Sequence, residues 1–187
     1  MATDPDQPLL TAEEFLQIDF GPDIKAELDN GVIRMMGGGS GEHARIQSNF
    51  MRFLGPALRG TGCRPFGSDM GVRTHDQSIR YPDVSVYCSG RTDPANDALK
   101  AFDDPRVVIE VLSPSTRRKD YGDKLEEYRE MPSIDTIVFV DPSTERLRIV
   151  QRTSPNSWSD ESFVGPVDLP LPSLNLTMPH AEIFARD

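Results

Sequence analysis

The stretch RVVIEVLSPSTRRKDYGDKLEEY, from Arg106 to Tyr128, decides the fold. Residues 107–112 are apolar and mostly β-branched apart from Glu110, and this composition predicts a strand covered on both faces. A carboxylate among such neighbours is unfavourable unless it is paired, protonated or bound to a metal ion. Glu110 is therefore the first candidate for a functional residue.

The second half of the same stretch predicts a helix over residues 117–131. Ser115 or Thr116 can cap its N-terminus, and Pro132 ends it. Helical periodicity gives this helix an inward face of three residues: Tyr121, Leu125 and Tyr128. Lys124 falls beside them, so the helix can bring an ammonium group back towards the acid on the strand.

The length and composition predict one globular domain spanning residues 1–187. Hydrophobic residues make up 37% of the chain and charged residues 27%, and no apolar run approaches the roughly 18 residues that cross a membrane. The two cysteines, Cys63 and Cys88, predict buried, reduced thiols in a cytoplasmic protein, with a disulfide as the less favoured alternative.

The formal net charge of −10 argues against a surface coated in basic residues for non-specific nucleic-acid binding. A local basic patch is compatible with it. The run Arg117-Arg118-Lys119 could contact phosphates, and a solvated first helical turn is the alternative, so its role stays open.

Caps, turns and periodicity predict the other elements. We expect a short helix at 11–16 with a capping box, a hairpin over 26–36 turning at Asn30-Gly31, and an amphipathic helix over about 42–59 capped by Ser40. Strands are expected within 62–74 and over 81–88, 136–140 and 147–150, followed by a polar loop at 152–162, an edge strand at 163–164 and a short helix near 181–185. His43, in the first turn of the long helix, has an open role.

Two acids fall on neighbouring predicted strands, Asp83 after Pro82 on one and Glu110 on the next. Such a pair can hold Mg²⁺ or Mn²⁺ through oxygen, with water and a substrate phosphate completing the coordination. A metal ion there would polarise the phosphate and lower the pKa of a bound water. Lys124 would steady the attacking water or the developing charge.

Three segments carry a resemblance: Pro82-Asp83, VIEVLSPST from Val108 to Thr116, and DYGDKLEEY from Asp120 to Tyr128. Together they resemble the putative restriction endonuclease family of bacterial genomes, within the PD-(D/E)XK nuclease superfamily. The likeness also includes these parts of the chain: TAEEF at 11–15, ELDNG at 27–31, His43, VDP at 140–142 and IFA at 183–185.

The resemblance implies an α/β fold: a mixed central β-sheet flanked by helices, a restriction-endonuclease-like core and an N-terminal β-hairpin. It implies Mg²⁺ or Mn²⁺ held by Asp83, Glu110 and Val111, with DNA as the substrate. Glu27 matches a further acid of the family and joins the catalytic set. The lysine that the superfamily places two residues after the acid is replaced here by Leu112, and Lys124 matches the helix lysine that takes over in relatives.

Two functions from different classes follow. The first is a metal-dependent endodeoxyribonuclease, favoured by the set of Asp83, Glu110 and Lys124. The second is a catalytically silent nuclease-fold module that binds nucleic acid or protein, favoured by the net charge of −10. Cutting both strands of a duplex takes two sites, so we expect a homodimer, which light scattering would test.

Overall fold

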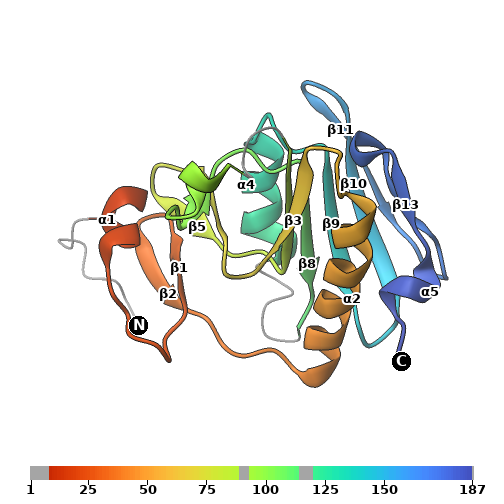
Figure 1. Cartoon of the computed structure of the whole chain (residues 1–187), viewed down its shortest axis with the longest axis horizontal. Coiled ribbons are helices and arrows are strands. Elements are labelled where there is room, and N and C mark those ends of the chain that lie inside the picture. The colour runs from red at the N-terminus through yellow and green to blue at the C-terminus, as the bar shows by residue number, and fades with distance from the viewer. Residues whose placement is uncertain (1–8, 89–92, 114–119, 187) are drawn as a thin grey trace.

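The computed structural model describes residues 9–88, 93–113 and 120–186, arranged as two large β-sheets and flanking helices (Figure 1). The predicted cap of the central helix, at Ser115 or Thr116, lies outside the described residues. Within these ranges, no helix combines the length and the apolar character that crossing a bilayer requires.

The larger sheet has six strands in the order β11-β10-β9-β8-β6-β3. Its strands are β3 (Cys63–Gly67), β6 (Val84–Cys88), β8 (Val107–Val111), β9 (Thr136–Asp141), β10 (Arg146–Ser154) and β11 (Ser157–Ser162). β8 and β9 run parallel and the other neighbours run antiparallel, so the sheet is mixed, as predicted. All five residues of β8 are buried, which confirms a central strand covered on both faces.

The smaller sheet has five strands in the order β2-β1-β5-β4-β7. They are β1 (Ala26–Asp29), β2 (Val32–Met35), β4 (Gly71–His75), β5 (Ser78–Arg80) and β7 (Ala101–Phe102). The predicted N-terminal hairpin is β1–β2, and both of its turn residues have positive φ, 48° at Asn30 and 78° at Gly31. The short strand β5, which no pattern predicted, pairs with both β1 and β4.

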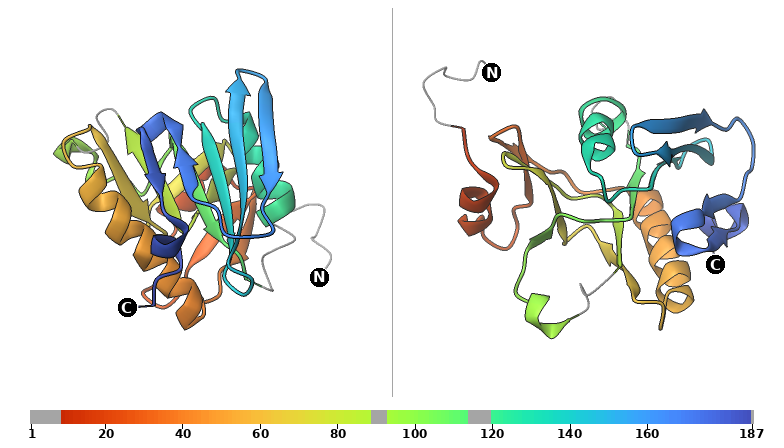
Figure 2. Two further views of the ribbon diagram at one scale, coloured as in Figure 1. Left: turned by 90° about the vertical axis from the view of Figure 1, so that its right-hand side faces the viewer. Right: turned by 90° about the horizontal axis from the view of Figure 1, so that it is seen from above.

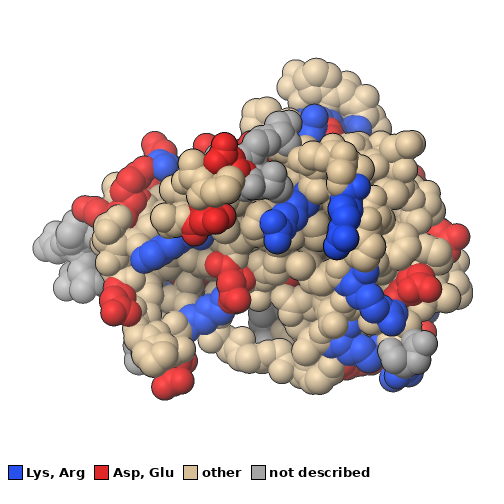
Figure 3. Space-filling view, viewed as in Figure 1, with Lys and Arg blue, Asp and Glu red and all other residues tan. Residues whose placement is uncertain are grey.

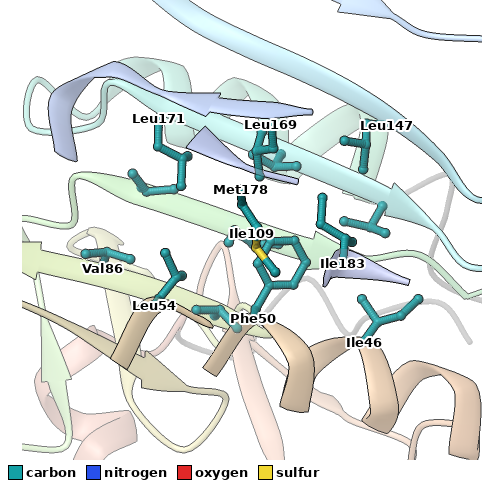
Figure 4. Close-up of a cluster of buried hydrophobic side chains, with 14 of the residues drawn as sticks. Ile46, Phe50, Leu54, Val86, Ile109, Leu147, Leu169, Leu171, Met178 and Ile183 are labelled. Atoms are coloured by element: carbon teal, nitrogen blue, oxygen red, sulfur yellow. The ribbon is translucent and has the colours of Figure 1, made fainter. Parts of the chain in front are cut away.

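Helix α2 (Gly41–Ala57) and helix α4 (Leu125–Glu130) cover opposite faces of the larger sheet (Figure 2). Beneath α2, the residues Ile46, Phe50 and Leu54 meet alternate residues of β6 and β8 and the C-terminal segments (Figure 4). Those segments are β12 (Leu169–Leu171), η3 (Pro172–Leu174), β13 (Leu176–Met178) and α5 (His180–Ile183). The other face of β8 presents Val108, Glu110 and Leu112 to α4.

Local sequence signals account for the helix starts. Helix α1 (Ala12–Gln17) has the predicted capping box between Thr11 and Glu14, and Ser40 accepts a hydrogen bond from the amide of His43 at 3.2 Å. Between β6 and β8, the described part of the chain contains a 3₁₀ turn, η1 (Pro94–Asn96), and then the strand β7. The start of the predicted central helix, at residues 117–119, lies outside the described residues; within the described part, residues 120–124 form a π-helical turn, η2 (Asp120–Lys124), ahead of α4.

The prediction for residues 152–164 is wrong. Residues 157–162 form β11, a hairpin partner of β10, where a polar loop was expected, and 163–164 add no strand. Serines and acids on an exposed edge strand hide the alternation that identifies strands. Trp158 is held there by the guanidinium of Arg152, which lies 4.2 Å from the centre of its ring.

The cysteine prediction is also wrong, because Cys63 and Cys88 form a disulfide between β3 and β6. The two residues are direct partners in the antiparallel register, a pairing that spacing along the sequence does not reveal. The cysteines therefore give no support to a reducing, cytoplasmic location.

We predict that the disulfide stabilises the chain by about 3 kcal/mol, the order expected for a closed loop of this length. The cysteines are 25 residues apart in sequence. Urea unfolding of wild type with and without reductant should show this difference, and a Cys63→Ser/Cys88→Ser variant should match reduced wild type. A variant whose stability still responds to reductant would contradict the assignment.

Candidate functional site

Glu110 is buried, with 4% of its surface exposed, and its partners lie on the helical segment that follows β8. Oε1 accepts hydrogen bonds from Nζ of Lys124 at 3.1 Å and from the hydroxyl of Tyr128 at 2.8 Å. Burial, and then the neighbouring Glu110 carboxylate, raise the pKa of Tyr128 well above its ordinary value. Tyr128 therefore stays protonated and acts as a hydrogen-bond donor to the acid.

Lys124 connects this acid to the N-terminal hairpin. Its Nζ lies 4.0 Å from Oε2 of Glu27 on β1, and the lysine is 5% exposed. It is the last residue of the π-helical turn, a local widening of a helix that is common at functional sites. The residues Glu27, Glu110 and Lys124, predicted from sequence to act together, are thus brought to one place.

Arg80, at the end of β5, organises the acids on the other side of Lys124. Its guanidinium is fully buried, and donates to Asp29 at 2.6 Å, to Glu127 at 2.8 Å through Nε, and to Glu27 at 3.4 Å. A further contact joins its Nη2 to Oε1 of Glu127. Thr74 donates to Glu127 as well, at 2.8 Å.

Burial alone would lower the pKa of Arg80. The ion pairs with Glu127, Glu27 and Asp29 outweigh burial, so the pKa lies above the ordinary arginine value and the cation is permanent. Arg80 thereby fixes Glu27 in position beside Lys124.

Asp83 occupies the end of the β6–β8 pair. Its Oδ1 lies 2.6 Å from Nε2 of His43, and Oδ2 accepts the amide N–H of Val111 at 2.7 Å. Gln47 donates to its backbone carbonyl at 2.9 Å. Since Val84 pairs with Ile109, Asp83 stands one step along the register, next to Glu110.

The predicted donor set fits a hard divalent cation. Asp83 stands opposite Glu110 when the β6–β8 register is extended by one residue, and in a strand the carbonyl of Val111 points to the same edge as its N–H, towards Asp83. Within the described ranges, however, no group of three or more His, Cys, Asp or Glu side chains is gathered around a single point. Mg²⁺ commonly uses only one or two carboxylates with waters and substrate phosphates, so this arrangement is compatible with it.

Three contributors were missed or left open by sequence reasoning: Arg80, Tyr128 as a donor, and His43. Arg80 has partners 47, 51 and 53 residues away, and nothing local signals them. His43 follows the cap Ser40 by three residues, and its partner Asp83 is 40 residues away. The packing face predicted for Tyr128 is correct, but its hydroxyl contact depends on the neighbouring strand.

We predict that Arg80→Met destabilises the protein by about 3–5 kcal/mol, because three buried carboxylates lose their common cation. Urea unfolding should show this loss at neutral pH. The loss should shrink as the pH falls, since the folded variant gains from protonating acids that repel one another.

Arg34→Met is the matched control, because Arg34 also contacts Asp29, at 3.2 Å, from a side chain that is 57% exposed. It should cost less than about 1 kcal/mol. Equal losses in the two variants would contradict a central role for Arg80.

Comparisons with known proteins agree with this architecture. Residues 12–179 match the model of the Uma2 family, described as "Putative restriction endonuclease". Two uncharacterized proteins of Synechocystis sp., slr1290 and sll1609, are each 29% identical, over 91% and 84% of this chain and 88% and 89% of their own lengths.

Among solved structures, a putative nuclease belonging to DUF820 from Anabaena variabilis superposes with a TM-score of 0.75. It covers 94% of this chain and 98% of its own, and its identity of 20% makes it a comparison of folds. The family match spans nearly all of the described fold and includes every residue of the site above, so the chain belongs to the putative restriction endonuclease family Uma2.

Proposed function

We propose that the protein is a metal-dependent endonuclease that hydrolyses phosphodiester bonds of DNA. In this proposal Asp83, Glu110 and the carbonyl of Val111 hold Mg²⁺ or Mn²⁺. Lys124 assists the attacking water, and Glu27 completes the acidic cluster. Membership of the family supports the nuclease activity, and the contacts of the site support the assignment of roles.

The observation that carries the proposal is an imbalance of buried charge. Of the charged residues that the structure describes as buried, seven surround this site: Glu27, Asp29, Arg80, Asp83, Glu110, Lys124 and Glu127. Five are acids and two, Arg80 and Lys124, are bases. Excess negative charge in a buried place is unfavourable unless a cation neutralises it. One divalent ion would neutralise most of the excess at this site.

The side chains can divide the chemistry. Lys124 donates a hydrogen bond to Glu110, and its ammonium charge beside that acid can steady an attacking water or the charge that develops on a phosphate oxygen. Glu27, within 4.0 Å of that ammonium, can accept a proton released from the water. A bound divalent ion would supply electrostatic polarisation of the phosphate and a more acidic water.

His43 and Tyr128 hold the two ligating acids in place. His43 contacts Asp83 from the first turn of α2, and Tyr128 donates to Glu110 from α4. The two helices on opposite faces of the sheet thus each orient one carboxylate. This support from a second layer of contacts is what a precise ligand geometry requires.

We predict that Mn²⁺ raises the melting temperature of wild type, because the ion binds only the folded state. The stabilisation should reach about 2.7 kcal/mol at a hundred-fold excess over Kd. Glu110→Gln should abolish this response. Glu130→Gln, which removes a carboxylate outside the site, is the control and should shift as wild type does. Equal shifts in Glu110→Gln and wild type would exclude Glu110 as a ligand.

A cleavage assay separates the enzyme from a silent binding module. Supercoiled plasmid should be nicked or linearised by wild type with Mg²⁺ or Mn²⁺, and Lys124→Met should lose at least about 100-fold in rate, the usual scale for one electrostatic or acid–base group. Lys124→Met should keep its metal-dependent melting shift. Lys100→Met is the control and should cleave normally, because Lys100 donates to the carbonyl of Leu16, away from the site.

If wild type binds the metal but cuts neither plasmid nor single strands, the non-catalytic alternative takes first place. The homodimer stays a prediction. Leu169, Leu171 and Ile183 are fully buried within the chain's own core, so these three side chains supply no dimer contact.

A further inference from the structure

A hollow of about 700 Å³ lies at the C-terminal end of α2, where the chain turns into β3. It is distinct from the acidic site, which contacts the N-terminal end of the same helix through His43. Two arginines, Arg59 and Arg64, line it, and none of its lining residues is acidic. On the face shown in Figure 3, blue side chains gather over α2 and β3.

These two arginines differ from most cations of the chain. Arg45, Arg52, Arg73, Arg106, Arg129, Arg148 and Arg186 all form ion pairs. Within the part of the chain that the structure describes, neither Arg59 nor Arg64 forms one, although acids outnumber bases by ten. Two exposed guanidinium groups without acidic partners at one hollow make a local positive site on an acidic protein.

Capping of the helix does not explain these arginines. The carbonyl of Leu54 accepts the amide of Leu58 at 2.9 Å, and the carbonyl of Leu58 accepts both the amide and the hydroxyl of Thr61, at 3.1 and 2.7 Å. The backbone amide of Arg59 donates to the carbonyl of Pro56. These carbonyls at the end of α2 are therefore satisfied by backbone groups and a threonine, and capping uses neither guanidinium group. The guanidinium of Arg64 lies 5.9 Å from the centre of the Phe66 ring, a contact with the ring face that does not use its N–H donors.

Glycines leave the wall of the hollow bare. Gly60 and Gly62 have φ of 81° and 82°, and this left-handed backbone conformation explains why glycine occupies both positions. Gly55 lies inside α2, where glycine is unfavourable relative to alanine, and a Cβ there would meet nothing within 4 Å. Gly55 precedes Pro56 inside α2, and a residue without a Cβ avoids the clash with the proline ring that disfavours helical backbone there. The bare backbone of Gly55 also leaves room for an external group at the wall of the hollow.

We infer that the hollow binds a phosphate of a nucleic-acid strand, with Arg59 and Arg64 as its donors. The choice of a strand rests on the proposed function, and the volume supports it, because 700 Å³ exceeds what a single phosphate fills. Met51, Pro56 and Pro65 supply apolar walls for a sugar or base. From His43 to Arg59 the helix rises about 24 Å, so a strand following α2 has about seven nucleotides between the two sites.

Binding of a DNA duplex in EDTA, where no cleavage occurs, tests the inference with the full-length chain. Arg59→Gln and Arg64→Gln should each weaken binding about ten-fold at low salt, and each should reduce the slope of log Kd against log salt by up to about 1. Arg146→Gln is the matched control: Arg146 is exposed, makes no ion pair with any described residue and lies outside the hollow. Losses no larger than in this control would overturn the inference.

Gly55→Leu provides a test that changes no charge. It should fill the hollow and weaken duplex binding. The melting temperature should fall, because a side chain at Gly55 is disfavoured by the ring of Pro56, so binding is compared at a temperature at which the variant is folded. Unchanged binding by a folded Gly55→Leu protein would overturn the inference. The last test is calorimetry with inorganic phosphate and with a mononucleotide. If either binds the hollow with a Kd as low as that of the duplex, the assignment to a nucleic-acid strand is overturned.

The readouts separate this inference from the proposed function. Glu110→Gln should lose metal-dependent cleavage and keep its EDTA binding, whereas the arginine variants should lose binding and still cleave at saturating DNA. Wild type that binds through the hollow but never cleaves would refute the catalytic proposal alone.

Discussion

The buried guanidinium of Arg80 is the interaction on which the site depends. It lies among Glu27, Asp29 and Glu127, which come from the N-terminal hairpin and the central helix. Without a common cation these acids would repel one another and leave buried charge unanswered. With it, two elements that belong to different layers are joined at one point, and Glu27 is held facing the ammonium of Lys124.

Periodicity and capping predict most of the fold. The Asn30-Gly31 turn, the Ser40 cap and the apolar run of β8 each carry a local signal with a physical cause, and each element is found where it was expected. β5 has only three residues, all of them buried, so its sequence shows no alternation, and β11 is an exposed edge strand that buries no face. Those strands exist because neighbouring strands offer hydrogen bonds.

The residues of the site also differ in whether a local sequence signal predicts them. Glu110 stands out because a charge among β-branched residues is locally anomalous, and Lys124 follows from helical spacing. Arg80, Tyr128 and His43 show no such anomaly, because their partners are distant in sequence or become neighbours only through strand register. The disulfide was mispredicted for the same reason: Cys63 faces Cys88 through the pairing of β3 with β6.

The sequence separation between the partners of Arg80 also matters for folding, both during synthesis and during refolding. Its contacts join residues 53 apart on one side and 47 apart on the other, so closing it carries a large loop entropy. A growing chain has no complete site until Glu127 has emerged and its helix has docked. A chain in which α4 has not docked against the N-terminal hairpin therefore lacks the complete network.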